Sequence, residues 1–348
     1  MIENNALHMA LHTALTNYFG HSEPLEVDLV QSLWSGYGAI SRYKDPLNEV
    51  STSSLSCIGK VVNLQKQDEH PRGWNSDFSH QRKLSSYLNE QSFYTNFALR
   101  TNHKCQVPKM YAAGADEKCI WMLLEDLDAA GFTERSTQPS LLLVELGIKW
   151  LANFHACFID SAYVRQATGH SDKTKNNVNN LWPIGTYWHL ATRPQEFQKM
   201  PESPLKEAAS KIDACLNNSK FKTIVHGDAK LANFCINSQQ TKLAAVDFQY
   251  VGRGVGIKDF VYFLGSCLDS QALYAQAPNL LTLYFNELKQ ATAQSSIDFD
   301  ALEEDYLSLY PFAWADFERF LTGWSPGHQK LNAYSSEQTQ KALKVLAM

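Results

Sequence analysis

One stretch of the sequence places two carboxylates and a side-chain amide around a short turn. Asp228 is followed five residues later by Asn233, and Asp247 lies just beyond the next apolar run. The segments 234–236 and 243–246 are apolar and flank a polar turn, a pattern typical of a β-hairpin. Because a hairpin returns the chain to its starting end, we expect Asn233 and Asp247 to lie side by side.

These side chains suit phosphate chemistry. An amide oxygen beside a carboxylate is a suitable donor set for Mg²⁺, which takes oxygen ligands and usually keeps others from water or phosphate. The spacing from His226 through Asp228 to Asn233 matches the kinase catalytic loop, in which the Asp accepts the substrate hydroxyl proton and the Asn holds metal. Asp228 is therefore the candidate catalytic residue, and Asn233 and Asp247 are the candidate metal ligands. Each of the three alone could be a turn or strand-end residue, but their combination around one hairpin favours catalysis.

The sequence HGDAKLANF followed by AVDFQYVGRG resembles the small-molecule kinases of the protein-kinase-like superfamily. This group includes aminoglycoside phosphotransferases, choline kinases and ecdysteroid kinase-like proteins. The sequence is most similar to the last of these. The resemblance implies an α+β, two-lobed protein-kinase-like fold. It places a small β-sheet lobe with one key helix, which binds nucleotide, at residues 1–127. A larger, mainly α-helical lobe at residues 128–348 would hold the catalytic and acceptor-binding groups.

The activity implied by the resemblance is an ATP- and Mg²⁺-dependent transfer of the γ-phosphoryl group to a hydroxyl of a small molecule. Gln249 stands where protein kinases carry Gly, and Gly227 replaces their Arg. Control by phosphorylation of an activation loop is therefore not expected. The resemblance leaves the choice between ATP and GTP open.

A lysine within an apolar strand is the next candidate. Lys60 lies alone in the predicted strand 55–62, and such a lysine must either reach solvent or find a buried acid. By the resemblance, the acid is Glu90 on the helix predicted for about 79–99. The pair would hold Lys60 against the α and β phosphates of ATP. The alternative is an exposed edge lysine and a solvated helix glutamate.

Two further segments are predicted to contact the nucleotide. Gly36 and Gly38 lie in a turn that resembles the nucleotide-covering hairpin of these kinases, and glycines let backbone amides approach phosphates. A plain hairpin turn is the alternative. The strand that begins near residue 119 leads, by the resemblance, into the hinge, where adenine would meet backbone groups from Glu125 to Leu127.

Supporting residues come from outside the hairpin. By the resemblance, His226 and Asp259 support the catalytic loop rather than react. Asp259 is predicted to cap the helix that follows the loop and to brace the loop backbone. The segment 141–159 is apolar enough to be the central helix of the large lobe, while its charged and polar residues argue against a membrane span.

The acceptor site is less defined. The aromatic segments 181–189 and 310–324 could line it or could serve only packing. In 310–324, aromatic faces beside acidic residues could hold a cationic or ring-shaped acceptor. Choline-like, aminoglycoside-like and polycyclic alcohols all stay open as acceptors. The polar segment 160–180 is predicted to be mobile.

Composition narrows the functional class. The 348 residues suffice for two lobes, and a net charge of −5 gives no basic field, which argues against a nucleic-acid partner. The seven cysteines form no CxxC pair, which favours reduced thiols and a cytoplasmic location over a disulfide frame. The N-terminus lacks the features of a signal peptide. The sequence leaves the oligomeric state open.

Two rival functions follow from the same pattern. A nucleotide-binding pseudokinase, acting as a scaffold without phosphotransfer, would be expected to lack a metal ligand or the strand lysine, and none is missing. A protein-directed kinase would be expected to show an Ala-Pro-Glu signal after Gln249, and none follows.

Overall fold

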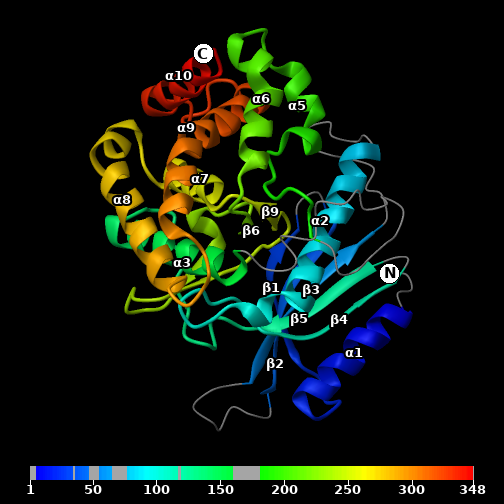
Figure 1. The fold of residues 1–348 in the computed structure, drawn as a ribbon. Helices are drawn as coiled ribbons and strands as arrows, with labels where there is room; N and C mark the ends of the chain where they lie inside the picture. Colours follow the sequence, from blue (N-terminus) through cyan, green and yellow to red (C-terminus); the bar gives the residue numbers. More distant parts are fainter. Residues whose placement is uncertain are drawn as a thin grey trace.

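The computed structural model describes residues 5–33, 36–46, 55–64, 77–116, 119–159 and 181–347. An antiparallel sheet with two helices precedes a mainly helical part, and the two lie against each other (Figure 1). This is the two-lobed α+β fold that the sequence predicts. The predicted mobile segment 160–180 lies outside the described residues, as do residues 34–35 of the glycine turn.

The sheet lobe contains five strands in the order β1-β2-β3-β5-β4, and all neighbouring pairs are antiparallel. Its elements are α1 (Asn5–Phe19), β1 (Glu26–Ser32), β2 (Gly38–Lys44), β3 (Ser56–Asn63), α2 (Asp77–Asn96), η3 (Ala98–Arg100), β4 (Met110–Ala115) and β5 (Cys119–Glu125).

Strand β5 is buried on both faces of the sheet. Because successive side chains of a strand point to opposite faces, Trp121 and Leu123 pack with the helix α1, whereas Met122 and Leu124 join the large core shared with the helical lobe. The helix α1 therefore covers the outer face of the sheet. The inner face is left for α2 and the helical lobe.

Within its described residues, the helical lobe encloses two short antiparallel strand pairs among its helices. Its elements are α3 (Leu141–Phe158), η4 (Leu190–Thr192), α5 (Pro194–Lys199), α6 (Pro204–Asn218), β6 (Thr223–Val225), η5 (Leu231–Asn233), β7 (Phe234–Ile236), β8 (Leu243–Ala245), β9 (Gly252–Gly254), α7 (Gly256–Cys267), α8 (Ser270–Ala291), α9 (Phe299–Trp324) and α10 (Ala333–Ala347).

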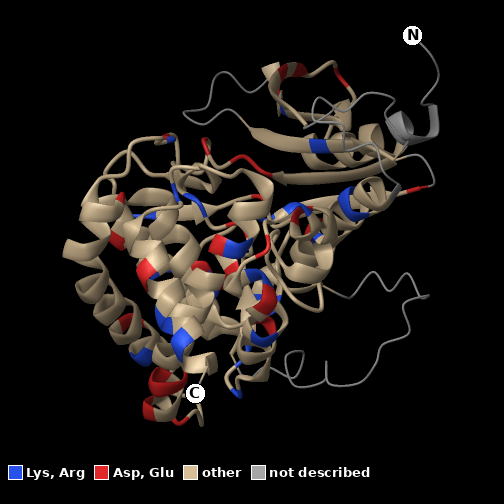
Figure 2. Cartoon of the chain, turned by 90° about the horizontal axis from the view of Figure 1, so that it is seen from above, with Lys and Arg blue, Asp and Glu red and all other residues tan. Residues whose placement is uncertain are grey.

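The helix α3 lies at the centre of this lobe. It packs tightly on α7. The closeness is seen at Gly147, where an added Cβ would lie 2.2 Å from the Phe263 ring. In the described part of the chain, α3 is the one helix whose length and composition would suffice to cross a membrane, and 61% of it is buried in this fold. Core helices pass the same test of length and composition. Charged residues of both signs are interspersed over the lobe (Figure 2).

Candidate active site

The predicted hairpin is confirmed and carries the candidate metal ligands at its open end. Strands β7 and β8 are antiparallel, with Phe234 opposite Ala245. The Val246 N–H then donates to the Asn233 carbonyl at 2.9 Å. Asn233 is therefore bonded to the residue just before Asp247, as a hairpin at this place requires.

Three donors hold the carboxylate of Asp228 in one orientation. The Tyr262 hydroxyl donates to Oδ1 at 2.7 Å, and Lys230 Nζ and Asn233 Nδ2 approach Oδ2 at 3.0 and 3.3 Å. Asn233 Nδ2 also donates to the Asp228 carbonyl at 2.8 Å. These bonds use the side-chain nitrogen of Asn233. The side-chain oxygen Oδ1 is therefore the atom left to bind a cation.

The side chain of Asp247 is half-buried, and its carboxylate oxygen Oδ1 is shielded from solvent. Its φ is +68°, in the left-handed region that Asp adopts more readily than most residues, and its Oδ1 has no hydrogen-bond partner among the described residues. Burial alone would raise its pKa, but Lys60, Lys83 and Lys230 outweigh burial and hold the pKa of Asp247 below its ordinary value. An ionised buried carboxylate with an unpartnered oxygen fits a divalent cation.

The donor set fits magnesium better than a softer metal. Within the described ranges, no cluster of three or more His, Cys, Asp or Glu side chains could hold a metal by itself. Asn233 and Asp247 would supply two oxygen ligands, and water and phosphate would supply the rest. Mg²⁺ usually binds through one or two carboxylates together with substrate phosphates.

The predicted pair of Lys60 and Glu90 is confirmed. The Lys60 Nζ lies 2.5 Å from Glu90 Oε2, and the two residues are 4% and 2% exposed. The alternative of an exposed edge lysine is therefore wrong. Burial raises the pKa of Glu90, although Lys60 opposes that shift. The strand lysine thus reaches the same buried region as Asp247, whose pKa it lowers.

A second lysine of this region, the half-buried Lys83, was not predicted from the sequence. Lys83 Nζ donates to Gln249 Oε1 at 3.0 Å, lies 4.7 Å from the centre of the Tyr87 ring, and is one of the cations acting on Asp247. Burial lowers the pKa of Lys83. The available signal was its position two turns before Glu90 on the same face of α2.

Asp259 braces the catalytic loop, as predicted, but it does not cap a helix. Its carboxylate accepts the backbone N–H groups of His226 at 2.5 Å and Gly227 at 3.0 Å, and His155 Nε2 lies 3.2 Å away. The residue at the N-cap of α7 is Val255, without a side-chain cap, and Asp259 lies in the first turn. The predicted cap is wrong because both carboxylate oxygens of Asp259 are already used by the loop.

The conformation of the catalytic loop accounts for two of its residues, Gly227 and His226. Gly227 has φ +80°, and a Cβ there would lie 2.2 Å from the Tyr250 carbonyl oxygen, so only glycine fits. His226 Nε2 lies 3.1 Å from the Val246 carbonyl and ties the loop to the hairpin. Burial lowers the pKa of His226, which keeps its imidazole neutral at physiological pH.

The backbone geometry of the glycine turn requires glycine at position 38. Gly38 has φ +149°, and a Cβ there would lie 1.9 Å from the Val61 carbonyl oxygen. Its carbonyl accepts the Leu33 N–H at 2.8 Å and closes the turn. Gly36 is exposed at φ +73°. The contact of these glycines with phosphate stays a prediction, and the plain hairpin turn explains Gly38 equally well.

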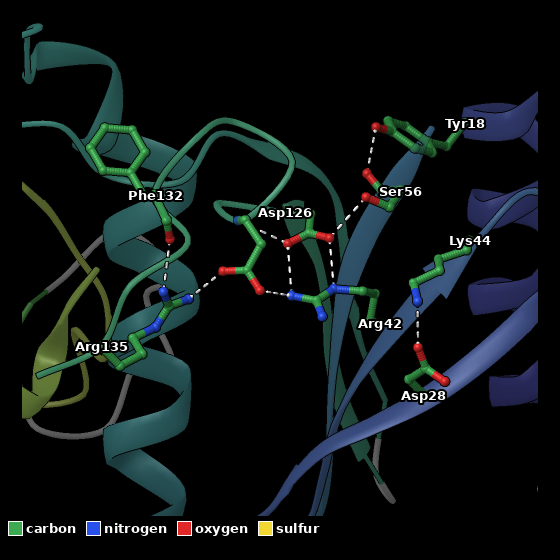
Figure 3. A network of polar contacts seen from close by, with 9 residues as sticks. Tyr18, Asp28, Arg42, Lys44, Ser56, Asp126, Phe132 and Arg135 are labelled. Carbon is green, nitrogen blue, oxygen red and sulfur yellow. Dashed lines mark hydrogen bonds and ion pairs between the residues drawn. The ribbon is translucent and has the colours of Figure 1, made fainter. Parts of the chain in front are cut away.

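The predicted hinge carries an ion-pair network that was not foreseen. Arg42 of β2 binds Asp126 through Nε at 2.7 Å and also contacts Asp128, while Ser56 donates to Asp126 at 2.8 Å (Figure 3). Arg135 binds Asp128 at 2.8 Å from the other side. We call these five residues the hinge network.

The backbone of the hinge is partly engaged. The Glu125 N–H donates to the Lys109 carbonyl and the Leu127 carbonyl accepts from the Phe132 N–H, both at 2.8 Å. Adenine contacts of Glu125 and Leu127 stay a prediction. Between them, the Asp126 carbonyl also accepts the Ala130 N–H at 3.0 Å.

The model of the ecdysteroid kinase-like family matches residues 79–296. The chain belongs to the ecdysteroid kinase-like family. The match covers α2, the catalytic loop, the hairpin and helices up to α8, and it ends before α9. A search of curated proteins found no match.

Several solved structures similar to this ecdysteroid kinase-like protein are named as kinases. One is a putative fructosamine-3-kinase from Haemophilus somnus, with 12% identity, a TM-score of 0.49 and coverage of 97% of each chain. A Plasmodium vivax ethanolamine kinase has 10% identity and a TM-score of 0.47 over 98% of this chain and 90% of the other. A microcompartment-associated aminopropanol kinase has 14% identity and a TM-score of 0.46 over 97% and 94%.

The two aromatic segments of this ecdysteroid kinase-like chain meet beside Asp228. Trp188 from 181–189 and Phe317 from 310–324 pack in one buried cluster with Tyr262, whose hydroxyl holds Asp228. The Trp188 and Tyr262 rings are stacked with centres 4.7 Å apart. Most of these rings therefore serve packing, and Tyr262 also fixes the position of the Asp228 carboxylate.

Asp316, one of the two acidic residues in the segment 310–324 that could hold a cationic acceptor, is engaged within the fold. Asp316 lies 3.0 Å from Lys258 Nζ and 2.8 Å from Arg319 Nη2, and all three residues are buried. Two cations already compensate its charge. Asp316 therefore offers no free carboxylate to a ligand.

Replacing Asp316 by Asn is expected to destabilise the fold by about 3–5 kcal/mol at neutral pH, because it leaves two buried cations without their partner. Burial alone would raise the pKa of Asp316, but Lys258 and Arg319 outweigh it and hold the pKa well below its ordinary value of 3.8. A depressed folded-state pKa contributes stability above the unfolded value, and this contribution is lost as pH falls. The difference in free energy of unfolding between wild type and variant, measured with urea, should therefore shrink below pH 3.8. A difference that is independent of pH would contradict this assignment.

Proposed function

We propose that this protein transfers the γ-phosphoryl group of ATP, in the presence of Mg²⁺, to a hydroxyl group of a small molecule. Membership of the ecdysteroid kinase-like family and the kinase-like fold support a phosphotransferase. The observation that carries the proposal is the unpartnered, buried Oδ1 of Asp247, close to Lys60 and next to the hairpin end that holds Asn233. Such a carboxylate is costly to bury unless a cation completes it.

Each residue has a distinct role in this proposal. Lys60, oriented by Glu90, would contact the α and β phosphates, and Asn233 and Asp247 would hold the metal. A bound magnesium ion would neutralise phosphate charge. Asp228 would orient the acceptor hydroxyl and take its proton.

Most of the rate enhancement would come from positioning and from charge stabilisation. Tyr262 and Lys230 contribute to positioning because they fix both oxygens of Asp228. Asp259 contributes by holding two consecutive backbone N–H groups of the catalytic loop. We assign nucleotide binding to residues 1–127 and acceptor binding to residues 128–348.

The direct test is a screen of small alcohols for acceptor-dependent ADP release and for phosphate ester formation, with and without Mg²⁺. We expect transfer to at least one alcohol and its loss when a chelator removes the metal. ATP binding without transfer to any alcohol, sugar or sterol would instead support a scaffold without phosphotransfer.

A further inference from the structure

We propose that Lys330 binds an anionic group of the acceptor, so that the preferred substrate is an alcohol that also carries a carboxylate, sulfate or phosphate group. This inference rests on the proposed function, because it names the acceptor class for the same site. Lys330 lies between α9 and α10, beyond the residues 79–296 that the family model matches. Family membership therefore assigns it no role.

The first observation is the position of the ammonium group. Lys330 Nζ lies 5.0 Å from the centre of the Tyr262 ring and 5.7 Å from that of Phe317. The hydroxyl of the same Tyr262 donates to Asp228 Oδ1 at 2.7 Å. A single aromatic ring thus bridges Lys330 and the carboxylate proposed to take the acceptor proton, so a small acceptor on Asp228 comes within reach of both.

The second observation is that the positive charge of Lys330 lacks a local partner. Its Nζ donates to Ser266 Oγ at 2.9 Å, and no carboxylate of the described residues lies within ion-pair distance of it. Of the other lysines of the site, Lys83 likewise donates to a neutral side chain, Gln249, whereas three have carboxylate partners. Lys60 has Glu90, Lys258 has Asp316, and Lys230 has Asp228.

The charge balance around the proposed base follows from these contacts. Asp228 is the acid that acts on both Lys230 and Lys330, so two ammonium groups share one carboxylate. Asp316 and Asp259 face inward and are already bonded. An acceptor with a negative group would compensate the charge of Lys330, whereas a cationic acceptor would bring a further positive charge beside it.

The cost of this arrangement supports a ligand role. Burial, together with the nearby Lys230, lowers the pKa of Lys330 to about 8, although Asp228 opposes the shift. The Lys330 ammonium group is therefore still largely protonated at neutral pH, although burial has removed part of its hydration. An anionic group of the acceptor would compensate the lost hydration of the ammonium group.

Equilibrium binding tests the inference without requiring turnover. The probes are pairs of a hydroxy acid and its methyl ester, such as para-hydroxymethylbenzoate and cholate with their esters, and para-hydroxymethylbenzylamine as the cationic analogue. We expect the wild-type protein to bind at least one acid roughly 10- to 100-fold more tightly than its ester, the effect of a hydrogen bond to a charged group. The amine should bind more weakly than either.

Variants then assign the preference to Lys330. Lys330→Met keeps the apolar stem and should abolish the preference for the acid, whereas Lys330→Arg should retain most of it. Lys344→Met, at an exposed position in the last turn of α10, is the matched control and should leave the preference unchanged. Circular dichroism melts check that the variants fold.

The outcomes separate this inference from the proposed function. If no acid binds the wild type more tightly than its ester, or if Lys330→Met keeps the preference, the inference is overturned even where alcohols are phosphorylated. If Lys330→Met weakens ATP binding and leaves the acid preference intact, Lys330 serves the nucleotide and the inference also fails. If the acid preference depends on Lys330 but no phosphate is transferred, the binding site stands and the phosphotransfer proposal fails.

Discussion

The Asp228→Asn variant is expected to turn over roughly 10²- to 10⁴-fold more slowly than the wild type, the usual loss when general acid–base help is removed. An amide cannot take the hydroxyl proton, and its nitrogen would face Lys230 or Tyr262, which now donate to the carboxylate. ATP binding should be largely kept, because Lys60 and Asp247 are unchanged. Steady-state turnover with the best acceptor and the affinity for a fluorescent ATP analogue measure the two effects separately.

The control for this prediction is Asp300→Asn, since the Asp300 side chain is 91% exposed at the start of α9. It makes the same chemical change away from the site and should leave turnover unchanged. Equal turnover of the Asp228 variant and the wild type would remove Asp228 from the role of catalytic base. A parallel loss of turnover and ATP affinity would point instead to a disordered catalytic loop.

The second large effect is expected for Asp247→Asn. Asn also tolerates a φ of +68°, so the backbone should be retained. The variant loses the negative charge that would face the metal, and a metal contributes several kcal/mol of charge stabilisation, equivalent to roughly 10³-fold or more in rate. Turnover should fall by that amount, and the Mg²⁺ concentration needed for half-maximal ATP binding should rise.

Titration of Mg²⁺ at a fixed ATP concentration distinguishes the metal role from a folding defect. A ligand change should shift the dependence on Mg²⁺ in a variant that is still folded at the assay temperature. The melting temperature without metal is expected to fall somewhat, because Asn leaves Lys60, Lys83 and Lys230 without the negative charge that compensates them. An unchanged dependence on Mg²⁺ would show that Asp247 is not a ligand. Asp300→Asn again provides the control.

The parts of the site that are close in sequence were predictable from the sequence alone. The apolar arms of the hairpin and the polar turn between them fix the relation of Asn233 to Asp247, because hairpin pairing is local. The pairing of Lys60 with Glu90 links a strand to a helix and followed from the resemblance to known kinases. The strand lysine by itself indicated only that a buried acid was needed.

The contacts missed from the sequence depend on the packing of distant elements. Tyr262 contacts Asp228 because α7 lies beside the catalytic loop. Lys330 contacts Tyr262 because the connection between α9 and α10 packs against α7. Nothing in the spacing of these residues indicates such contacts. The error about Asp259 has the same origin, since its place in the first turn of a helix is typical of a cap and its true partners lie in another segment.

The hinge network has a consequence for how the two lobes can move. Asp126 and Asp128 flank a single residue, Leu127, and bind Arg42 of the sheet lobe, while Arg135 binds Asp128 from the segment that leads to α3. A rotation between the lobes would have to stretch one of these guanidinium contacts. We therefore expect any opening to pivot about Leu127 and to become easier at high ionic strength, where exposed links such as that of Arg135 are screened first.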